Sequence, residues 1–368
     1  MYDVIIRDGT IVRSSGRLVA DIAIQDGKIA YVGGNPGGPA KEEISAIGRF
    51  VMPGVIDAHV HFRDPGDPSI ESWATGSVEA LRGGVTTVLD MPSVEPATLC
   101  IDTVQAKLDK AAKDSVVNYG VWAGASADNM AGLAELWETG KVCGTMVYMG
   151  ESAGPFEINP AQLEDLFHQS KGLLGVHAED RAVLEAARAD WEGRDNPVHN
   201  DVRPPGASVK AVETLIALVQ QTKRAVHICH LSTAGELAVL DPYRGDLPIT
   251  SEVSPHHLFL STDNASDLGN MAKTNPPIRP ELDRRAMVAA LKRGRLDTFG
   301  SNHAPHTIAQ KQQRVIEAAR DSGNVSRTHV HRYVCPRGEA LCFGTGTALA
   351  EAVEAGCKHA LIAHDNLK

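Results

Sequence analysis

Two histidines separated by one residue lie in the segment Asp57-Ala58-His59-Val60-His61. Alternate side chains of a β-strand share a face, so both imidazoles can reach one cation if this segment is a strand. Imidazole nitrogen is a good zinc ligand. The motif alone leaves a second interpretation open, in which the two histidines are buried and only form hydrogen bonds. Arg63, two residues later, adds a guanidinium suited to a carboxylate beside the metal.

Two more histidines follow apolar, strand-like runs. They are His177, in Gly175-Val176-His177-Ala178-Glu179-Asp180, and His230, in Ile228-Cys229-His230-Leu231-Ser232-Thr233. Taken singly, each is typical of a packing or capping histidine. Taken together with His59 and His61, they form a four-histidine set that favours a metal site.

Polar residues also gather in segments 273–279 and 301–306. Asn275 precedes two prolines and is placed to bind an amide or carbonyl of a ligand; the alternative is an ordinary Asn-Pro turn. Asn302, His303 and His306 close the last strand-like run. Ser254-Pro255-His256-His257 is interpreted as a loop whose neighbouring histidines point to opposite sides.

The elements that position these residues change in character near residue 51. Before it, two strand–turn–strand units are predicted, around Asp8-Gly9 and Asp26-Gly27, because Asp-Gly suits a tight hairpin turn. After it, short apolar runs alternate with helical segments, which is typical of βαβ units. Strands are predicted at 51–60, 84–91, 116–124, 143–149, 173–179, 225–231, 248–254 and 297–302. Helices are predicted near 70–82, 102–113, 128–138, 160–170, 180–191, 206–221, 233–240 and 281–293.

This alternation predicts a (β/α)8 barrel of the TIM type over residues 51–310. A small β-sandwich domain is expected over residues 1–50, and an atypical tail over 311–368. An open, doubly wound sheet is the alternative, but no Gly-x-Gly-x-x-Gly follows a first strand. The histidines fall at the carboxyl ends of predicted strands, which in a barrel share the mouth where active sites are built.

Composition excludes several classes of protein. The 368 residues are 43% hydrophobic and 22% charged, which is typical of a globular chain. The net charge of −10 argues against a nucleic-acid or anionic-membrane partner. No apolar run approaches the roughly 20 residues of a membrane span. Six scattered cysteines without a Cys-x-x-Cys indicate reduced thiols, as expected in the cytoplasm.

Together these segments resemble the cyclic amidohydrolases of the amidohydrolase superfamily, and the dihydroorotase family most closely. The resemblance runs from about residue 2 to about residue 311. The matching segments are MPGVIDAHVHFRDPG (52–66), GGVTTVLDMP (83–92), VCGTMVYMGES (142–152), VHAED (176–180), ICHLST (228–233), SPHHLFL (254–260), TNPPIR (274–279) and SNHAPH (301–306). Arg63 and the paired prolines after Asn275 favour the dihydroorotase family over the hydantoinases, while the allantoinases stay close.

The resemblance implies a (β/α)8 barrel with a β-sandwich assembled from both termini. It implies reversible hydrolysis of dihydroorotate to N-carbamoyl-aspartate in pyrimidine synthesis, with zinc as Lewis acid and source of the nucleophile. The implied zinc ligands are His59 and His61 for one ion and His177 and His230 for a second. Arg63, Asn275 and His306 are implied to hold the substrate carboxylate and ring, and Ser93 stands where the family has a substrate-binding Asn.

Two residues depart from the family pattern at the catalytic centre. Asn302 stands where the family has an Asp that binds zinc and moves a proton, and an amide can do neither. Met146 stands where a carboxylated Lys bridges two metals, and a thioether is a poor zinc ligand. We therefore expect one zinc ion with reduced affinity and a doubtful second ion. Glu151 is a candidate substitute for the missing bridge.

The tail and the changed residues leave competing functions open. After Gln310 the family's later loop, helices and final strands do not follow, so the sandwich is expected to be incomplete. A shifted reading frame and drift after loss of activity both explain the tail. The main expectation is an impaired dihydroorotase. The alternatives are a pseudoenzyme that serves as a structural partner, for instance of a carbamoyltransferase, and an allantoinase or hydantoinase. A homodimer is a further expectation from the resemblance.

Overall fold

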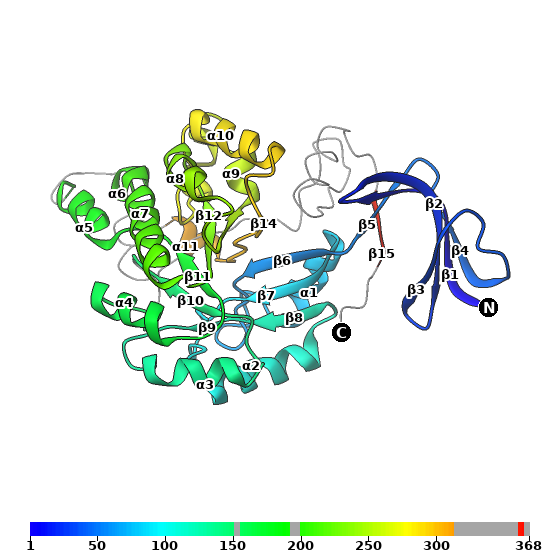
Figure 1. The fold of residues 1–368 in the computed structure, drawn as a ribbon, viewed down its shortest axis with the longest axis horizontal. Coiled ribbons are helices and arrows are strands. Elements are labelled where there is room, and N and C mark those ends of the chain that lie inside the picture. The colour runs from blue at the N-terminus through cyan, green and yellow to red at the C-terminus, as the bar shows by residue number, and fades with distance from the viewer. Residues whose placement is uncertain (151–154, 192–198, 313–359, 364–368) are drawn as a thin grey trace.

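The computed structural model describes residues 1–150, 155–191, 199–312 and 360–363, with a sheet of N-terminal strands at one end and a barrel at the other (Figure 1). The six-stranded sheet has the order β15-β5-β1-β2-β3, and β4 pairs with β1. Its strands are β1 (Tyr2–Arg13), β2 (Gly16–Gln25), β3 (Lys28–Gly33), β4 (Ala40–Ser45), β5 (Phe50–Pro53) and β15 (Ala360–Ala363). One face buries an apolar cluster that includes Ile6, Ile22 and Val51.

The predicted turn at Asp8-Gly9 is wrong. β1 is a single strand with a bulge between Ile6 and Gly9, where Asp8 has a φ of 58°. The Asp8 N–H donates to Asp21 Oδ1 at 2.9 Å, so a bulge accommodates the positive φ without reversing the chain. The chain turns after Arg13 instead. The Asp26-Gly27 turn is confirmed, since β2 and β3 pair antiparallel on either side of it.

The barrel strands match the predicted series closely, except that residues 51–53 of the first predicted strand belong to β5 of the N-terminal sheet. The barrel strands are β6 (Val55–Val60), β7 (Val85–Asp90), β8 (Asn118–Val121), β9 (Ala123–Gly124), β10 (Thr145–Tyr148), β11 (Leu174–His177), β12 (Val226–Leu231), β13 (Ile249–Val253) and β14 (Thr298–Phe299). All pair in parallel, in the groups β6-β7-β8 and β9 through β14. Trp122 separates β8 from β9 within the one strand that was predicted there. A bridge between Val60 and His303 closes the ring beside β6.

Helices surround the strands (Figure 1). They are α1 (Trp73–Arg82), α2 (Ile101–Asp114), α3 (Leu133–Glu138), α4 (Pro160–Gln169), α5 (Arg181–Ala189), α6 (His199–Val202), α7 (Pro205–Thr222), α8 (Ala234–Leu240), α9 (Pro255–Phe259), α10 (Glu281–Lys292) and α11 (Ile308–Gln312), with 3-10 turns η1 (Met130–Gly132), η2 (Asp241–Tyr243) and η3 (Ser266–Ala272). Polar side chains cap several of them at the start: Asn159 accepts from the Gln162 N–H, and Asp180 from the Val183 N–H. The largest apolar cluster joins strand residues such as Val88 to helix residues such as Leu215.

Two further predictions can be checked against the structure. The predicted loop at Ser254-Pro255-His256-His257 is wrong, because Pro255 begins α9 and both histidines are buried with ring centroids 4.3 Å apart. Proline suits the first turn of a helix, where no N–H partner is needed. Most of the predicted tail lies outside the described residues. Within the described part of the chain, no helix is long and apolar enough to cross a membrane.

Candidate functional site

Three barrel strands bring the four predicted histidine ligands to the same end of the barrel. His59 lies in β6 and His61 follows that strand directly. His177 is the last residue of β11, and His230 is the last but one of β12. None of the four is more than 2% exposed. The carboxyl ends of parallel strands therefore place them as the sequence predicts.

The histidines form two pairs. The Nε2 atoms of His59 and His61 lie 3.2 Å apart, and His177 Nδ1 lies 3.1 Å from His230 Nε2. Two nitrogens that bind one tetrahedral zinc ion, each at about 2.0–2.1 Å, lie about 3.3 Å from each other. Each pair therefore has the spacing of two ligands of one ion. The His59 and His230 ring centroids, 5.2 Å apart, bring the two pairs next to each other.

In each of these histidines, one ring nitrogen faces the partner of the pair and the other, outward nitrogen points away from it. Carboxylates contact the outward nitrogens of two of the four. His59 Nδ1 lies 2.9 Å from Glu252 Oε1, and His177 Nε2 lies 2.7 Å from Glu179 Oε2. An ionised carboxylate only accepts hydrogen bonds, so the outward nitrogens carry the protons and the facing nitrogens carry lone pairs. This arrangement is typical of histidines that bind metal.

The two remaining histidines differ in their outward contacts. His61 Nδ1 lies 2.8 Å from Ser93 Oγ, which fixes the orientation of its ring. His230 Nδ1 is buried without a hydrogen-bond partner. The His230 backbone has a φ of 37°, an uncommon value for a residue with a side chain. Side chains thus orient three of the four rings. The fourth residue, His230, is held through its backbone N–H, which donates to Glu252 Oε1 at 3.0 Å.

Burial sets the ionisation of the site. It lowers the pKa of His177, and it lowers the pKa of His61 and of His230 well below the usual range. These imidazoles are therefore neutral near pH 7, which is the form that binds a metal. Burial would raise the pKa of Glu179, but the charge of Arg203 and the hydrogen bond from His177 outweigh it and lower that pKa well below normal.

Cys229 lies beside the first pair but does not make a separate centre. Ligand atoms of His59, Cys229 and Glu252 lie within 4.8 Å of one another. Burial, and then the charge of Glu252, raises the pKa of the Cys229 thiol well above normal, so the sulfur keeps its proton. Glu252 Oε1 already accepts from His59 and from the His230 backbone N–H, the latter at 3.0 Å. Glu252 therefore supports the histidine pairs, and Cys229 stays a protonated thiol beside them.

Asn302 reaches the site from beyond β14. Its Nδ2 donates to the carbonyl oxygen of Asn275 at 3.0 Å. Its backbone has a φ of 50°, a conformation that asparagine tolerates better than most residues. The amide contributes hydrogen bonds but no charge and no proton-accepting group.

Met146 lies in β10 and is fully buried. It belongs to an apolar cluster inside the barrel with Met91, Trp122 and Tyr148. Its thioether therefore contributes packing where the family pattern has an anionic bridge. Glu151, the predicted substitute, lies outside the described residues.

The four predicted substrate-binding residues lie around the first pair. Arg63 Nη2 is 3.5 Å from His306 Nδ1, and Arg63 Nε donates to the Pro305 carbonyl oxygen at 3.0 Å. Asn275 lies next to Asn302, whose Nδ2 donates to the Asn275 carbonyl oxygen. Ser93, in contrast, contacts the outward nitrogen of His61.

Three residues that contact the site were not predicted from the sequence. Glu252 bonds to His59, and Arg203 bonds to Glu179. The third is His199, whose Nε2 is 2.8 Å from Asn275 Oδ1. A glutamate within the predicted strand 248–254 was a signal that could have pointed to Glu252. Arg203 and His199 lie in loops and short helices between strands, and their partners are distant in sequence. No local pattern marks such contacts.

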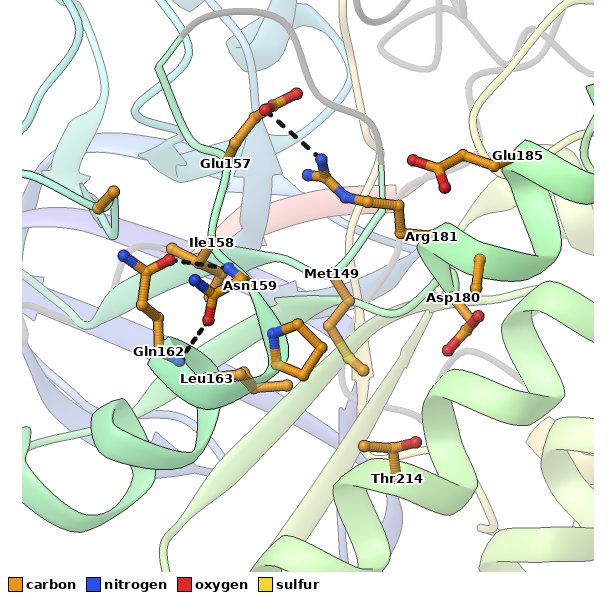
Figure 2. Close-up of a pocket in the computed structure, with 13 residues that line it drawn as sticks. Met149, Glu157, Ile158, Asn159, Gln162, Leu163, Asp180, Arg181, Glu185 and Thr214 are labelled. Atoms are coloured by element: carbon orange, nitrogen blue, oxygen red, sulfur yellow. Dashed lines mark hydrogen bonds and ion pairs between the residues drawn. The ribbon is translucent and has the colours of Figure 1, made fainter.

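A cavity of about 660 Å³ lies between the beginnings of α4 and α5 (Figure 2). Its apolar lining includes Met149, Ile158 and Leu163, and an ion pair of 3.4 Å joins Arg181 to Glu157 beside it. None of the predicted site residues lines it. The cavity therefore belongs to the helical layer and not to the histidine site.

The model of the amidohydrolase family matches residues 50–341, which is most of the chain. The matched range contains all four histidines, Asn302 and Met146.

Curated relatives are similar along most of the chain. A dihydroorotase of Methanosarcina acetivorans is 33% identical over 323 residues, covering 84% of this chain and 69% of its own length. A dihydroorotase of Halobacterium salinarum is 35% identical and covers 85% of this chain and 72% of its own. An allantoinase of Bacillus velezensis is 32% identical, with coverages of 83% and 69%.

Among solved structures, the L-hydantoinase (dihydropyrimidinase) of Arthrobacter aurescens has a TM-score of 0.84 and 25% identity. The similarity covers 91% of this chain and 76% of that one. Dihydropyrimidinase from Brevibacillus agri has a TM-score of 0.82 at 24% identity, covering 98% of this chain and 78% of its own. Both support the predicted TIM-type barrel with an N-terminal β domain.

Proposed function

The chain belongs to the amidohydrolase family, and on that premise we propose that it is a zinc-dependent cyclic amidohydrolase of the dihydroorotase type. The spacing of the two histidine pairs carries the proposal. Nitrogen–nitrogen separations of 3.2 and 3.1 Å, with the outward nitrogens of His59 and His177 held by carboxylates, are what zinc ligands need. His59 and His61 hold one ion, and His177 and His230 hold a second, weaker one. One or two zinc ions are thus the proposed cofactor.

The proposed substrate is dihydroorotate, whose carboxylate suits the guanidinium of Arg63. Arg63 is partly buried beside His306, so an anion there exchanges water for charged hydrogen bonds. His199 donates to Asn275 Oδ1, which turns the amide nitrogen of Asn275 away from His199. A nitrogen donor suits a carbonyl of the substrate ring. Ser93 acts on the substrate only through the ring of His61.

The chain's own residues bind and orient the substrate. Zinc, when bound, supplies Lewis acidity that activates a carbonyl and a water molecule. Arg63, Asn275 and His306 fix the ring and its carboxylate against that centre. Asn302 holds the Asn275 backbone but cannot take up a proton. Removing a group that moves a proton typically costs about 10²–10⁴-fold in rate, so we expect slow turnover.

The test is dihydroorotate hydrolysis by the purified full chain, with zinc supplied and the bound metal counted in the same sample. We expect bound zinc and slow but measurable turnover, faster than with allantoin or hydantoin. Turnover of allantoin or hydantoin in preference to dihydroorotate would assign the chain to a different substrate within the same family. Bound zinc without turnover of any of the three contradicts the proposed activity.

Asn302 and Met146 favour a second candidate function. Both positions lack the anionic group of the family pattern, so a pseudoenzyme that acts as a structural partner is the alternative, for instance to a carbamoyltransferase. This alternative predicts no turnover together with a stable complex in size-exclusion chromatography with a carbamoyltransferase. A homodimer is tested in the same measurement.

A further inference from the structure

Glu252 contacts both histidine pairs. Its Oε1 accepts from His59 Nδ1 of the first pair at 2.9 Å and from the backbone N–H of His230, in the second pair, at 3.0 Å. It lies in β13 and is 1% exposed. A single carboxylate oxygen thus accepts a hydrogen bond from one histidine of each pair.

Among the described residues, no lysine or arginine forms an ion pair with Glu252. Its ion-pair partners among the described residues are two imidazoles, His59 at 2.9 Å and His227 at 3.7 Å, and its Oε2 is buried without a hydrogen bond. Burying a carboxylate is costly unless positive charge lies nearby. Glu179, by comparison, is paired with Arg203. Of the two carboxylates that bond to these histidines, Glu252 is therefore the one whose negative charge can stabilise a bound cation.

The barrel makes room for this carboxylate. A Cβ added to Gly300, which directly follows β14, would lie 2.0 Å from Glu252 Oε2. Glycine at 300 lets β14 approach the carboxylate closely. The position of Glu252 is thus set from two sides, by Gly300 on one and by the histidine supports on the other.

We propose that Glu252 is the positioning residue on which metal binding at both histidine pairs depends, taking the place of the anionic groups that Asn302 and Met146 do not supply. The proposal rests on the metal dependence of the proposed function. Through His59 the carboxylate orients the ring and makes its facing nitrogen a stronger donor, and through the His230 backbone it fixes the second pair. It does not touch the substrate.

The test compares metal binding by the metal-stripped wild type, Glu252→Gln and Glu71→Gln, using zinc in competition with a chelator and the visible spectrum of bound Co²⁺. Glutamine has nearly the size of glutamate, and its amide oxygen can still accept the hydrogen bonds made to Oε1. The change therefore removes the charge and puts an NH2 group in the place of Oε2, which accepts no hydrogen bond. Glu71 makes a similar contact at 2.9 Å with the ring of His303, which is not one of the four histidines of the pairs, and this makes it a matched control. We expect Glu252→Gln to weaken binding about 10–100-fold and to shift the Co²⁺ spectrum. Glu71→Gln is expected to behave like the wild type.

A third variant separates the shared role from a local one. Glu179→Gln reaches only His177 and should weaken one ion, whereas Glu252→Gln should weaken every ion that the wild type binds. If circular dichroism shows that Glu252→Gln does not fold, Gly300→Ala replaces it, because the added methyl displaces the carboxylate and keeps its charge. Weakened zinc binding by Gly300→Ala supports the proposal, and unchanged binding overturns it.

The outcomes distinguish this inference from the proposed function. Zinc affinity of Glu252→Gln equal to that of the wild type overturns the inference and leaves the function intact. A wild type that binds zinc but hydrolyses none of the three substrates overturns the function, and the inference stands if Glu252→Gln binds more weakly. A wild type that binds no zinc overturns both.

Discussion

At the scale of single residues, the amide of Asn302 is a hydrogen-bond donor. Its Nδ2 donates to the Asn275 carbonyl oxygen at 3.0 Å. A carboxylate at this position would regain the capacity to take up a proton but would lose the donor toward Asn275. The proposed catalytic impairment therefore involves the hydrogen bond to Asn275 and also the missing charge at Met146.

For this reason Asn302→Asp alone should restore little activity. We expect dihydroorotate hydrolysis to stay within about 10-fold of the wild-type rate, because the defect at Met146 remains and the contact to Asn275 is lost. The measurement is the steady-state rate with zinc present. Asn302→Asp combined with Met146→Lys is the comparison that should exceed either single change. A rise of 100-fold from Asn302→Asp alone would show that the two losses are independent.

Arg63 offers a second test at this scale. Arg63→Lys keeps the charge but removes the planar fork, and lysine cannot make both the Pro305 contact and a two-point contact to a carboxylate. We expect the Kd for N-carbamoyl-aspartate, measured by calorimetry, to rise about 10–100-fold. Arg82→Lys, in an exposed pair with Glu79 on α1, is the control that should bind as the wild type does. Unchanged affinity in Arg63→Lys would place the ligand carboxylate elsewhere.

At the scale of elements, periodicity predicted the barrel well and contacts between elements poorly. The predicted strand at 225–231 and β12 differ by one residue, because a run of buried apolar residues fixes a strand locally. The bulge at Asp8 was missed because its cause, the Asp21 carboxylate, lies 13 residues away in the sequence. The same limit explains the site: the histidines follow strand patterns, whereas Glu252 meets His59 only after the barrel closes.

A buried ion pair between elements gives a stability prediction. Lys107 of α2 pairs with Asp90 at the end of β7, and both are fully buried. Asp90 Oδ1 accepts from the Phe62 N–H at 2.7 Å, and Lys107 Nζ donates to the Met91 carbonyl oxygen at 2.6 Å. This pair thus joins the loop after His61 to the loop before Ser93.

Lys107→Met should lower the free energy of unfolding by about 3–5 kcal/mol, because it leaves Asp90 buried without its counter-charge. Adding Asp90→Asn should recover part of that loss, since the amide can still accept from Phe62 without carrying a charge. Urea unfolding measures both variants. Lys110→Met, an exposed position on the same helix, is the control and should cost less than about 1 kcal/mol. A loss of less than 1 kcal/mol for Lys107→Met would contradict the structural role of the pair.

At the scale of the whole molecule, buried neutral histidines set the stability in acid. Burial, and then the charge of Arg279, lowers the pKa of His257 to about 4, while its Nε2 lies 3.2 Å from the Pro277 carbonyl oxygen. An unfolded histidine has a pKa of about 6.5. Between pH 6.5 and pH 4 the unfolded chain therefore binds a proton that the folded chain does not, and stability falls as the pH falls.

The contribution of His257 over this range is about 3 kcal/mol, at about 1.4 kcal/mol per unit of pKa. His257→Asn can still donate to Pro277 and does not titrate, so its unfolding free energy should fall less steeply between pH 6.5 and pH 4. Urea unfolding at a series of pH values gives the two slopes. His168→Asn, at an exposed position on α4, should keep the wild-type slope. Equal slopes for the wild type and His257→Asn would refute the linkage.

The connection between the N-terminal sheet and the barrel has a mechanical consequence. β5 pairs with β1 in the sheet, and a single residue, Gly54, separates β5 from β6, the strand that contains His59. A Cβ at Gly54 would lie 2.0 Å from the Thr86 hydroxyl, so the joint is packed tightly against β7. The sheet and the strand of the first histidine pair are thus directly connected along the chain. A pulling force applied to the sheet is transmitted along the backbone to the strand that contains His59. Such a force would therefore act directly on the position of His59.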